Sequence, residues 1–283
     1  MKRRTIDIVV RWGMRAVTYF IVAVIAYIIA DIVWKGIPAL SWDFVTGAPR
    51  ESGAAGGIFP VIVGTFYLMV GTIAVALPLG MASAIYLSEY ARQGRFTRAI
   101  RLAIITLAGV PSIVFGLFGL GLFVLFFGFG ASILSGSLTL ACMVLPTIIV
   151  ASEEALRAVP QYLREGSLAL GAGKWQTIQK NVLPYAIPGM ITGSVLSIGR
   201  AAGETAPILL TAAAFYLPNL PRSVFDPCMA LPYHLYVLAT QHPDAAKVRP
   251  MQYGTALVLV ALVMGVNFGA ILIRVHFRKK YKW

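Results

Sequence analysis

Two charged residues, Arg200 and Glu204, stand four positions apart inside an apolar stretch, a spacing that predicts one face of a helix, and the hydroxyl residue Thr205 follows them. A charge at the centre of a membrane helix costs about 2.5–3.5 kcal/mol on insertion scales, whereas an i,i+4 pair on an isolated helix returns roughly 0.2–0.5 kcal/mol. The planar guanidinium of arginine can bind an oxyanion through two parallel N–H donors. We therefore predict a water-accessible or protein-lined interior in which Arg200 lies on the path of a tetrahedral oxyanion. A structural salt bridge to a neighbouring helix or subunit is the alternative.

A polar segment punctuated by glycines, residues 154–184, stands between two strongly apolar runs. Its hydrophobic spacing predicts two short helices, the first beginning near Pro160 and ending at Gly171, and the second beginning at Lys174 and closed by Pro184. Their apolar or small faces consist of Leu163, Gly166, Ser167 and Leu170 on the first helix and Trp175, Ile178 and Val182 on the second. Such faces bury little within the loop, so they suit docking into a groove on a partner. An amphipathic loop lying on the inner membrane surface is the alternative.

The same segment contains a run that resembles a phosphate-binding loop at first sight, G-S-L-A-L-G-A-G-K-W from Gly166. The pattern G-x4-G-K-[S/T] fails because Leu168 occupies the position of the first glycine and Trp175 that of the Mg²⁺-binding hydroxyl. Cys142 and Cys228 match no metal-ligand spacing, and the three histidines are scattered. We therefore expect no nucleotide site, no cofactor, no metal and no catalytic residue in this chain.

The composition of the chain is that of an all-α integral membrane protein. Its 283 residues are 58% hydrophobic and 12% charged, the mean hydropathy is +0.79, and soluble domains are about 25% charged. A membrane-spanning helix needs about 20 mainly apolar residues. Six spans are expected, at roughly 16–34, 60–87, 102–127, 136–151, 185–215 and 254–275. Pro146 should interrupt the short fourth span, and the prolines of the second and fifth favour kinks or breaks there.

The net charge of +13 is distributed as in a membrane protein rather than a nucleic-acid-binding protein. With the N-terminus cytoplasmic and the first helix uncleaved, most of the 24 Lys and Arg residues fall on the inner side, the bias that sets membrane orientation. We expect residues 1–283 to form a single transmembrane domain. Its predicted parts outside the membrane include a cytoplasmic N-terminus (1–15), an inner loop (152–184), an outer loop (216–253) and a basic cytoplasmic tail (276–283), which would lie at anionic lipid.

The spacing of Glu165, Gly171, Leu183 and Pro184 resembles the cytoplasmic loop of ABC-importer permeases, E-A-A-x3-G-x9-I-x-L-P. Gly166-Ser167 replaces the two alanines of that pattern, and Asn181 stands where isoleucine is usual. The resemblance implies a type I ABC importer permease fold, with two coupling helices that dock onto an ATP-hydrolysing partner. The residues to which it assigns this docking are Leu163, Glu165, Gly166, Leu170, Gly171, Trp175, Ile178, Leu183 and Pro184.

The string G-R-A-A-G-E-T-A-P-I-L-L from Gly199 resembles the permeases of Pst-type phosphate importers, and most closely their PstA-type subunit. This resemblance implies that Arg200, Glu204 and Thr205 line the path of phosphate across a bacterial plasma (inner) membrane. It also implies a second homologous permease, two copies of an ATPase that bind ATP and Mg²⁺, and an extracytoplasmic phosphate-binding protein.

Two other functions stay open. A permease of the same superfamily could carry another oxyanion, such as sulfate, molybdate or phosphonate. An ion-coupled secondary carrier would work without ATP, but such carriers often show internal repeats. The sequence contains no second copy of the string from Arg200 to Thr205, and such a carrier would have no use for a coupling loop.

Overall fold

The computed structural model describes residues 2–50 and 55–280, and most of these residues are helical. The long helices are α1 (Lys2–Gly36), α3 (Phe59–Ile85), α6 (Ile133–Arg157), α9 (Leu183–Ala202) and α12 (Ala245–Lys280). The shorter ones are α2 (Trp42–Thr46), α4 (Arg95–Ala108), α5 (Ser112–Gly119), α7 (Gln161–Ala169), α8 (Lys174–Thr177), α10 (Ala206–Thr211) and α11 (Leu231–Thr240). A 3₁₀ turn, η1 (Ile37–Ala39), three π-helical segments, η3 (Tyr86–Tyr90), η4 (Leu120–Phe126) and η5 (Ile178–Val182), and a hairpin of β1 (Pro49–Arg50) with β2 (Ala55–Gly56) complete the described chain.

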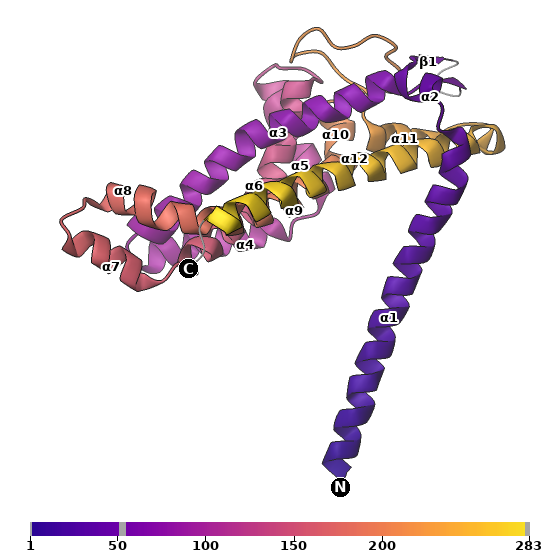
Figure 1. The fold of residues 1–283 in the computed structure, drawn as a ribbon. Coiled ribbons are helices and arrows are strands. Elements are labelled where there is room, and N and C mark those ends of the chain that lie inside the picture. The colour runs from indigo at the N-terminus through magenta and orange to yellow at the C-terminus, as the bar shows by residue number, and fades with distance from the viewer. Residues whose placement is uncertain (1, 51–54, 281–283) are drawn as a thin grey trace.

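The helices other than α1 form one elongated body (Figure 1). The short helices α7 and α8 lie at one end of it, and α2, β1 and α11 lie at the other. Helix α6 is the centre of this body, because it packs against α3, α9, α4 and α5, and most of its apolar stretch is buried. Helix α1 projects away from the body, and the C-terminal end of α1 contacts α12 (Figure 1).

Within residues 2–50 and 55–280, five helices are long and apolar enough to cross a membrane, and the number rises to six if one bent pair counts as a span. This pair, α4 and α5 with its extension η4, is bent by 103°. The span predicted over 102–127 is therefore two helices joined by a bend and not one straight helix. The chain turns at Gly109–Pro111, where proline has no backbone N–H to continue the first helix.

The prediction that Pro146 interrupts a short fourth span is wrong. Helix α6 runs through Pro146 for 25 residues, and Pro146 is buried within the helix. The predicted break in the fifth span is confirmed, because α9 ends at Ala202 and α10 begins at Ala206. The predicted outer loop, 216–253, contains α11 and the first turns of α12, and the predicted tail is helical as far as Lys280. Residues 281–283 of that tail lie outside the described residues.

Glycines allow the central helices to approach one another closely, as small residues do between membrane helices. A Cβ on Gly80 of α3 would lie 2.6 Å from Ile148 Cγ2 of α6, and one on Gly136 of α6 would press on Leu68 of α3 at 2.9 Å. The tightest case on α3 is Gly64, where an added Cβ would collide with the carbonyl oxygen of Met229, in the segment that leads into α11.

We predict that Gly64→Ala lowers the free energy of unfolding of the purified chain by about 1–3 kcal/mol, the usual range for overpacking, because the obstructing atom belongs to the backbone. Gly265→Ala on α12 is the matched control, since nothing lies within 4 Å of a Cβ there. It should leave stability unchanged or raise it, because alanine favours helix over glycine by about 1 kcal/mol. Thermal unfolding of both variants in detergent checks this, and equal midpoints would contradict it.

Candidate functional site

Arg200 and Glu204 lie at the break between α9 and α10. Arg200 occupies the last turn of α9, and its Nε donates a hydrogen bond to Glu204 Oε1 at 3.2 Å. Glu204 follows the end of the helix, so the prediction that the two residues share a helical face is wrong. The bond uses Nε and neither of the two Nη atoms. The two residues are therefore joined, while the Nη donors that would bind an oxyanion lie outside this bond.

The sequence explains why the helix breaks here. Gly203 ends α9 and donates its N–H to the Arg200 carbonyl, and Pro207 stands in the first turn of α10, where its missing N–H costs nothing. Thr205 is the N-cap residue of α10, and its carbonyl accepts the N–H of Leu209. A positive charge in the last turn of a helix is stabilised by the helix dipole, and Arg200 occupies that position.

The two members of the pair differ in exposure. The side chain of Arg200 is 51% exposed, whereas that of Glu204 is 16% exposed and borders a small cavity that Thr65 and Ile208 also line. Leu196, one turn before Arg200, is also exposed, while Ala201 and Ala202 are buried. Arg200 therefore lies on a face of α9 that the chain itself leaves open, and Glu204 anchors it to the interior.

The predicted first loop helix is α7, and its end has the expected geometry. Gly171 has a φ of +81°, which favours glycine. The N–H of Gly171 donates to the Leu168 carbonyl at 3.0 Å, and that of Ala172 donates to the Ser167 carbonyl at 3.2 Å. These two bonds form a complete Schellman motif, so the prediction that Gly171 is the residue after the helix end is confirmed.

The positions at which the loop departs from the importer pattern contact one another. Asn181 Nδ2 donates to Ser167 Oγ at 2.9 Å, and Ser167 Oγ also lies 2.9 Å from Thr177 Oγ1. Ser167 belongs to α7, whereas Thr177 and Asn181 belong to α8 and η5. The departures therefore compensate each other, because three polar side chains join the two loop helices where the usual pattern has alanine and isoleucine.

The structure divides the predicted docking residues into exposed and internal ones. Leu170 is 90% exposed and Trp175 is 55% exposed, and Glu165, Gly166 and Gly171 are also exposed. Ile178 and Val182 are buried, and Leu163 and Leu183 pack against the same inner core as Val182. The prediction that Ile178 shares an accessible face with Trp175 is wrong, because the π-helix η5 begins at Ile178 and the residue faces inward.

Between α7 and α8 lies a hollow of about 520 Å³ that is open to the outside of the chain. It is lined by Tyr162, Leu163, Gly166, Ser167, Leu170, Gly171, Ala172, Gln176 and Asn181. Sequence analysis missed Tyr162, although it lies one turn from Gly166 on α7 and is exposed.

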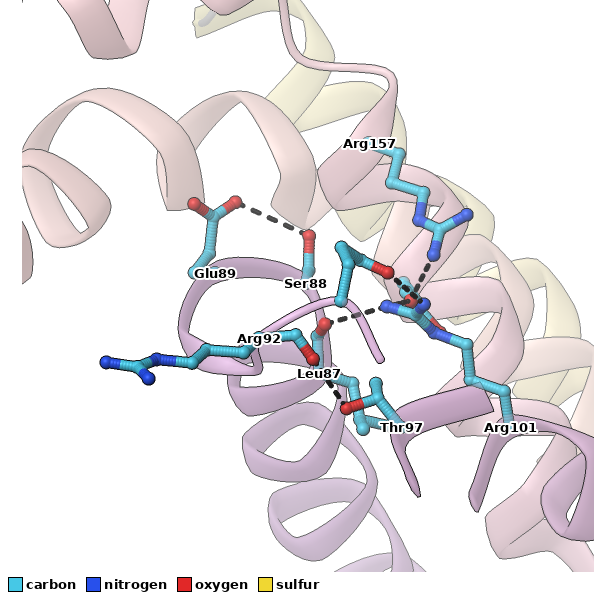
Figure 2. A network of polar contacts seen from close by, with 9 residues as sticks. Leu87, Ser88, Glu89, Arg92, Thr97, Arg101 and Arg157 are labelled. Carbon is cyan, nitrogen blue, oxygen red and sulfur yellow. Dashed lines mark hydrogen bonds and ion pairs between the residues drawn. The ribbon is translucent and has the colours of Figure 1, made fainter. Parts of the chain in front are cut away.

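A network of arginines and carboxylates lies next to this loop (Figure 2). Glu153, on α6, accepts hydrogen bonds from Arg101 at 2.8 Å and from Arg157 at 2.7 Å. Arg101 also donates to the Leu87 carbonyl at 2.9 Å, which ties α4 to the end of α3. Sequence analysis counted these arginines only as inner-side charges. The Glu153–Arg157 pair has the i,i+4 spacing of a helix face and could have been found, whereas Arg101 is too distant from Glu153 in sequence for a local pattern to show.

Known proteins similar to this chain are transport subunits. Residues 76–283 match the family described as binding-protein-dependent transport system inner membrane component. The phosphate transport system permease protein PstA 1 of Mycobacterium tuberculosis is 42% identical over 222 residues, which cover 78% of this chain and 70% of that protein. The probable ABC transporter permease protein YqgI of Bacillus subtilis is 35% identical over 264 residues, which cover 88% of each.

Solved structures give the fold. A chain of the bacterial alginate ABC transporter in complex with alginate pentasaccharide-bound periplasmic protein aligns with a TM-score of 0.62 at 13% identity, and the alignment covers 94% of this chain and 92% of that chain. A chain of the inward-facing MetNI methionine ABC transporter aligns with a TM-score of 0.59 at 18% identity and covers 78% and 94%. The chain belongs to the family of binding-protein-dependent transport system inner membrane components, and its fold is that of a type I ABC importer permease.

Proposed function

We propose that this chain is a permease subunit of an ATP-driven importer of inorganic phosphate in a bacterial plasma membrane. The observation that carries the proposal is the exposed guanidinium of Arg200, held by Glu204 at a break between two membrane helices, in a chain similar to proteins named PstA. Broken membrane helices are tolerated where the irregular backbone lines a cavity or is buried in protein. Arg200, Glu204 and Thr205 would lie on the phosphate path.

Arginine suits the recognition of phosphate at this position. Its fixed fork of donors matches two oxygens of a tetrahedral oxyanion, and charge-assisted hydrogen bonds of this kind are about twice as strong as neutral ones. Glu204 would keep the path from becoming a deep anion trap, because its negative charge opposes tight binding. A transport path requires both features, since the ion must enter and leave.

The proposed complex contains several partners. A second homologous permease would complete the path, two copies of an ABC ATPase would bind the inner loops, and an extracytoplasmic phosphate-binding protein would deliver the substrate. ATP and Mg²⁺ would be bound by the ATPase, so this chain would need no cofactor and catalyse no reaction itself. Both termini would be cytoplasmic, which places α7, α8 and the basic tail on the inner side.

The hollow between α7 and α8 supports the docking of the ATPase. The exposed apolar side chains Leu170, which lines the hollow, and Trp175, on α8, would insert into a groove on the partner in the helix-in-groove mode. Closure of the ATPase dimer would push on α7 and α8 and thereby tilt the membrane helices. This step would switch access to Arg200 from the outer to the inner side.

We predict that Arg200→Ala lowers phosphate uptake at least tenfold, because a hydrogen bond to a charged group is worth about 1.5–3 kcal/mol. The measurement is uptake of radiolabelled phosphate by a strain without its own high-affinity importer, supplied with this chain and its partner subunits. Arg222→Ala, in an exposed outer segment, is the matched control and should transport normally.

The assembled complex distinguishes the alternatives for Arg200. Wild-type uptake that excess phosphate suppresses and excess sulfate does not would support phosphate as the substrate. Unchanged uptake by Arg200→Ala would return this residue to a structural role, and loss of assembly would identify a structural salt bridge. An assembled wild-type complex without phosphate uptake would point to a different oxyanion, such as sulfate, molybdate or phosphonate.

We predict that Gly171→Trp abolishes co-purification of the ATPase while the permease stays in the membrane. A tryptophan at a φ of +81° is strained, and its bulk would lie at the mouth of the hollow. Gly94→Trp is the control, because Gly94 precedes α4 in the preceding inner segment, has an extended backbone and has nothing within 4 Å of an added Cβ. Recovery of normal amounts of ATPase with Gly171→Trp would refute the docking proposal.

A further inference from the structure

The guanidinium of Arg164, on the loop helix α7, lies among the ends of two membrane helices. Its Nη2 and Nε bond both oxygens of Glu89, at 2.7 Å and 3.3 Å. Its Nη1 also donates to the Val159 carbonyl and its Nη2 to the Leu156 carbonyl, each at 2.8 Å. One side chain of α7 therefore holds the end of α3, through Glu89 of η3, and the end of α6.

The Arg164–Glu89 contact is both bidentate and buried. The side chain of Arg164 is 16% exposed and that of Glu89 is 9% exposed. Burying two charges carries a desolvation cost that often cancels their attraction, so stability alone is a weak reason for such a pair. The distinctive property of this pair is its geometry, because a bidentate arginine–carboxylate pair fixes the orientation of both partners. Among ion pairs of the described residues, Glu89–Arg164 is the one that joins the loop helices to α3.

The second loop helix attaches at the neighbouring residue. Lys174 begins α8, and its Nζ lies 4.8 Å from the ring centroid of Tyr90, a cation–π distance. Glu89 and Tyr90 are the last two residues of η3, which continues α3 without a break. Both loop helices therefore hold the same end of α3, one through an ion pair and the other through an aromatic ring.

Helix α3 extends from this attachment to the far end of the molecule. It packs against α6 and α9 along its course and begins at Phe59, beside the outer segments (Figure 1). Near that end, Thr65 Oγ1 accepts the backbone N–H of Leu231, the first residue of α11, at 2.8 Å. A displacement of the inner end of α3 would therefore reach the outer face through one continuous helix.

We propose that Arg164 is the contact through which α7 moves the membrane helices during transport: its ion pair with Glu89 moves α3, and its bonds to the Leu156 and Val159 carbonyls keep α6 with α7. The inference rests on the proposed docking of an ATPase on α7 and α8. In this mechanism Glu89 and Arg164 are positioning residues: they touch neither phosphate nor the ATPase, and they transmit the displacement of the loop to the membrane helices. Without the ion pair, α7 and α6 can follow the ATPase while α3 stays behind.

The test is Glu89→Gln in the complete complex, reconstituted in liposomes with the ATPase and the phosphate-binding protein. The readout is phosphate transported per ATP hydrolysed, measured together with the amount of co-purified ATPase. We expect normal co-purification and a fall of this ratio by about 2- to 30-fold, the range for residues that carry coupling between sites. Glu154→Gln, at the same end of α6 but exposed, is the matched control and should keep the wild-type ratio.

Arg164→Lys provides a second, milder variant. Lysine keeps a positive charge opposite Glu89, but it cannot form the bidentate bond or reach the carbonyls of Leu156 and Val159 at once. We expect a ratio between that of wild type and that of Glu89→Gln. If Glu89→Gln lowers assembly, Arg164→Lys decides the question, and a ratio equal to that of the Glu154→Gln control would overturn the inference.

The outcomes for the two proposals are distinct. Absence of ATPase co-purification or phosphate uptake with the wild-type chain would refute the proposed function. A wild-type complex that transports phosphate, together with a Glu89→Gln complex of unchanged transport per ATP, would overturn the inference and leave the proposed function standing. A lower ratio with intact docking supports the transmitting role, because a contact that serves only folding would change the amount of complex and not its coupling.

Discussion

The structure depends on one constraint: in a membrane every backbone N–H and C=O group must be bonded within the protein, so the ends and breaks of helices need partners. Arginine side chains supply several of these partners at the end of the molecule that carries α7. Arg164 bonds the Leu156 carbonyl in the last turn of α6 and the Val159 carbonyl beyond it, and Arg101 bonds the Leu87 carbonyl after α3. Each of these arginines also bonds a carboxylate, which offsets its buried charge. The ends of α3 and α6 are consequently linked to α4 and α7 by charged hydrogen bonds.

The same constraint places the proposed phosphate path and the docking loop at opposite ends of one helix. Helix α9 begins at Leu183, directly after η5, and its last turn carries Arg200. Twenty helical residues span about 30 Å, the thickness of the hydrocarbon core. A movement of α8 and η5 therefore reaches Arg200 through a continuous backbone, while the contact of Arg164 carries the movement of α7 to α3 and α6. The two routes therefore join the loop of α7 and α8 and the break after α9 into one unit that moves together.

Much of this arrangement follows from local sequence patterns. Apolar runs predicted the long helices, and the position of Gly171 predicted the end of α7, because both depend on residues close in the chain. The exposure of Ile178 was predicted wrongly, since a face drawn on a regular α-helix does not hold where π-helical geometry changes the number of residues per turn. The bend at Gly109–Pro111 has a visible cause, but apolar content alone does not show its angle of 103°. The Glu89–Arg164 pair joins residues 75 positions apart, which no local pattern can show.

The exposure of Arg200 has a consequence for the unit that transports. A guanidinium that is half exposed on a membrane helix cannot face hydrocarbon, because a charge there costs several kcal/mol and Glu204 shields only the Nε edge. Its side chain lies in the last turn of α9, at the end opposite the loop of α7 and α8, so it cannot extend to the surface on which that loop lies. The open face formed by Leu196, Arg200 and Gly203 must therefore contact water or another protein. Water at this depth in turn requires a wall on the opposite side, which the described part of this chain does not provide. The second permease of the proposed complex would supply that wall, and the physical reason for pairing two such chains is the charge that each would otherwise expose to lipid.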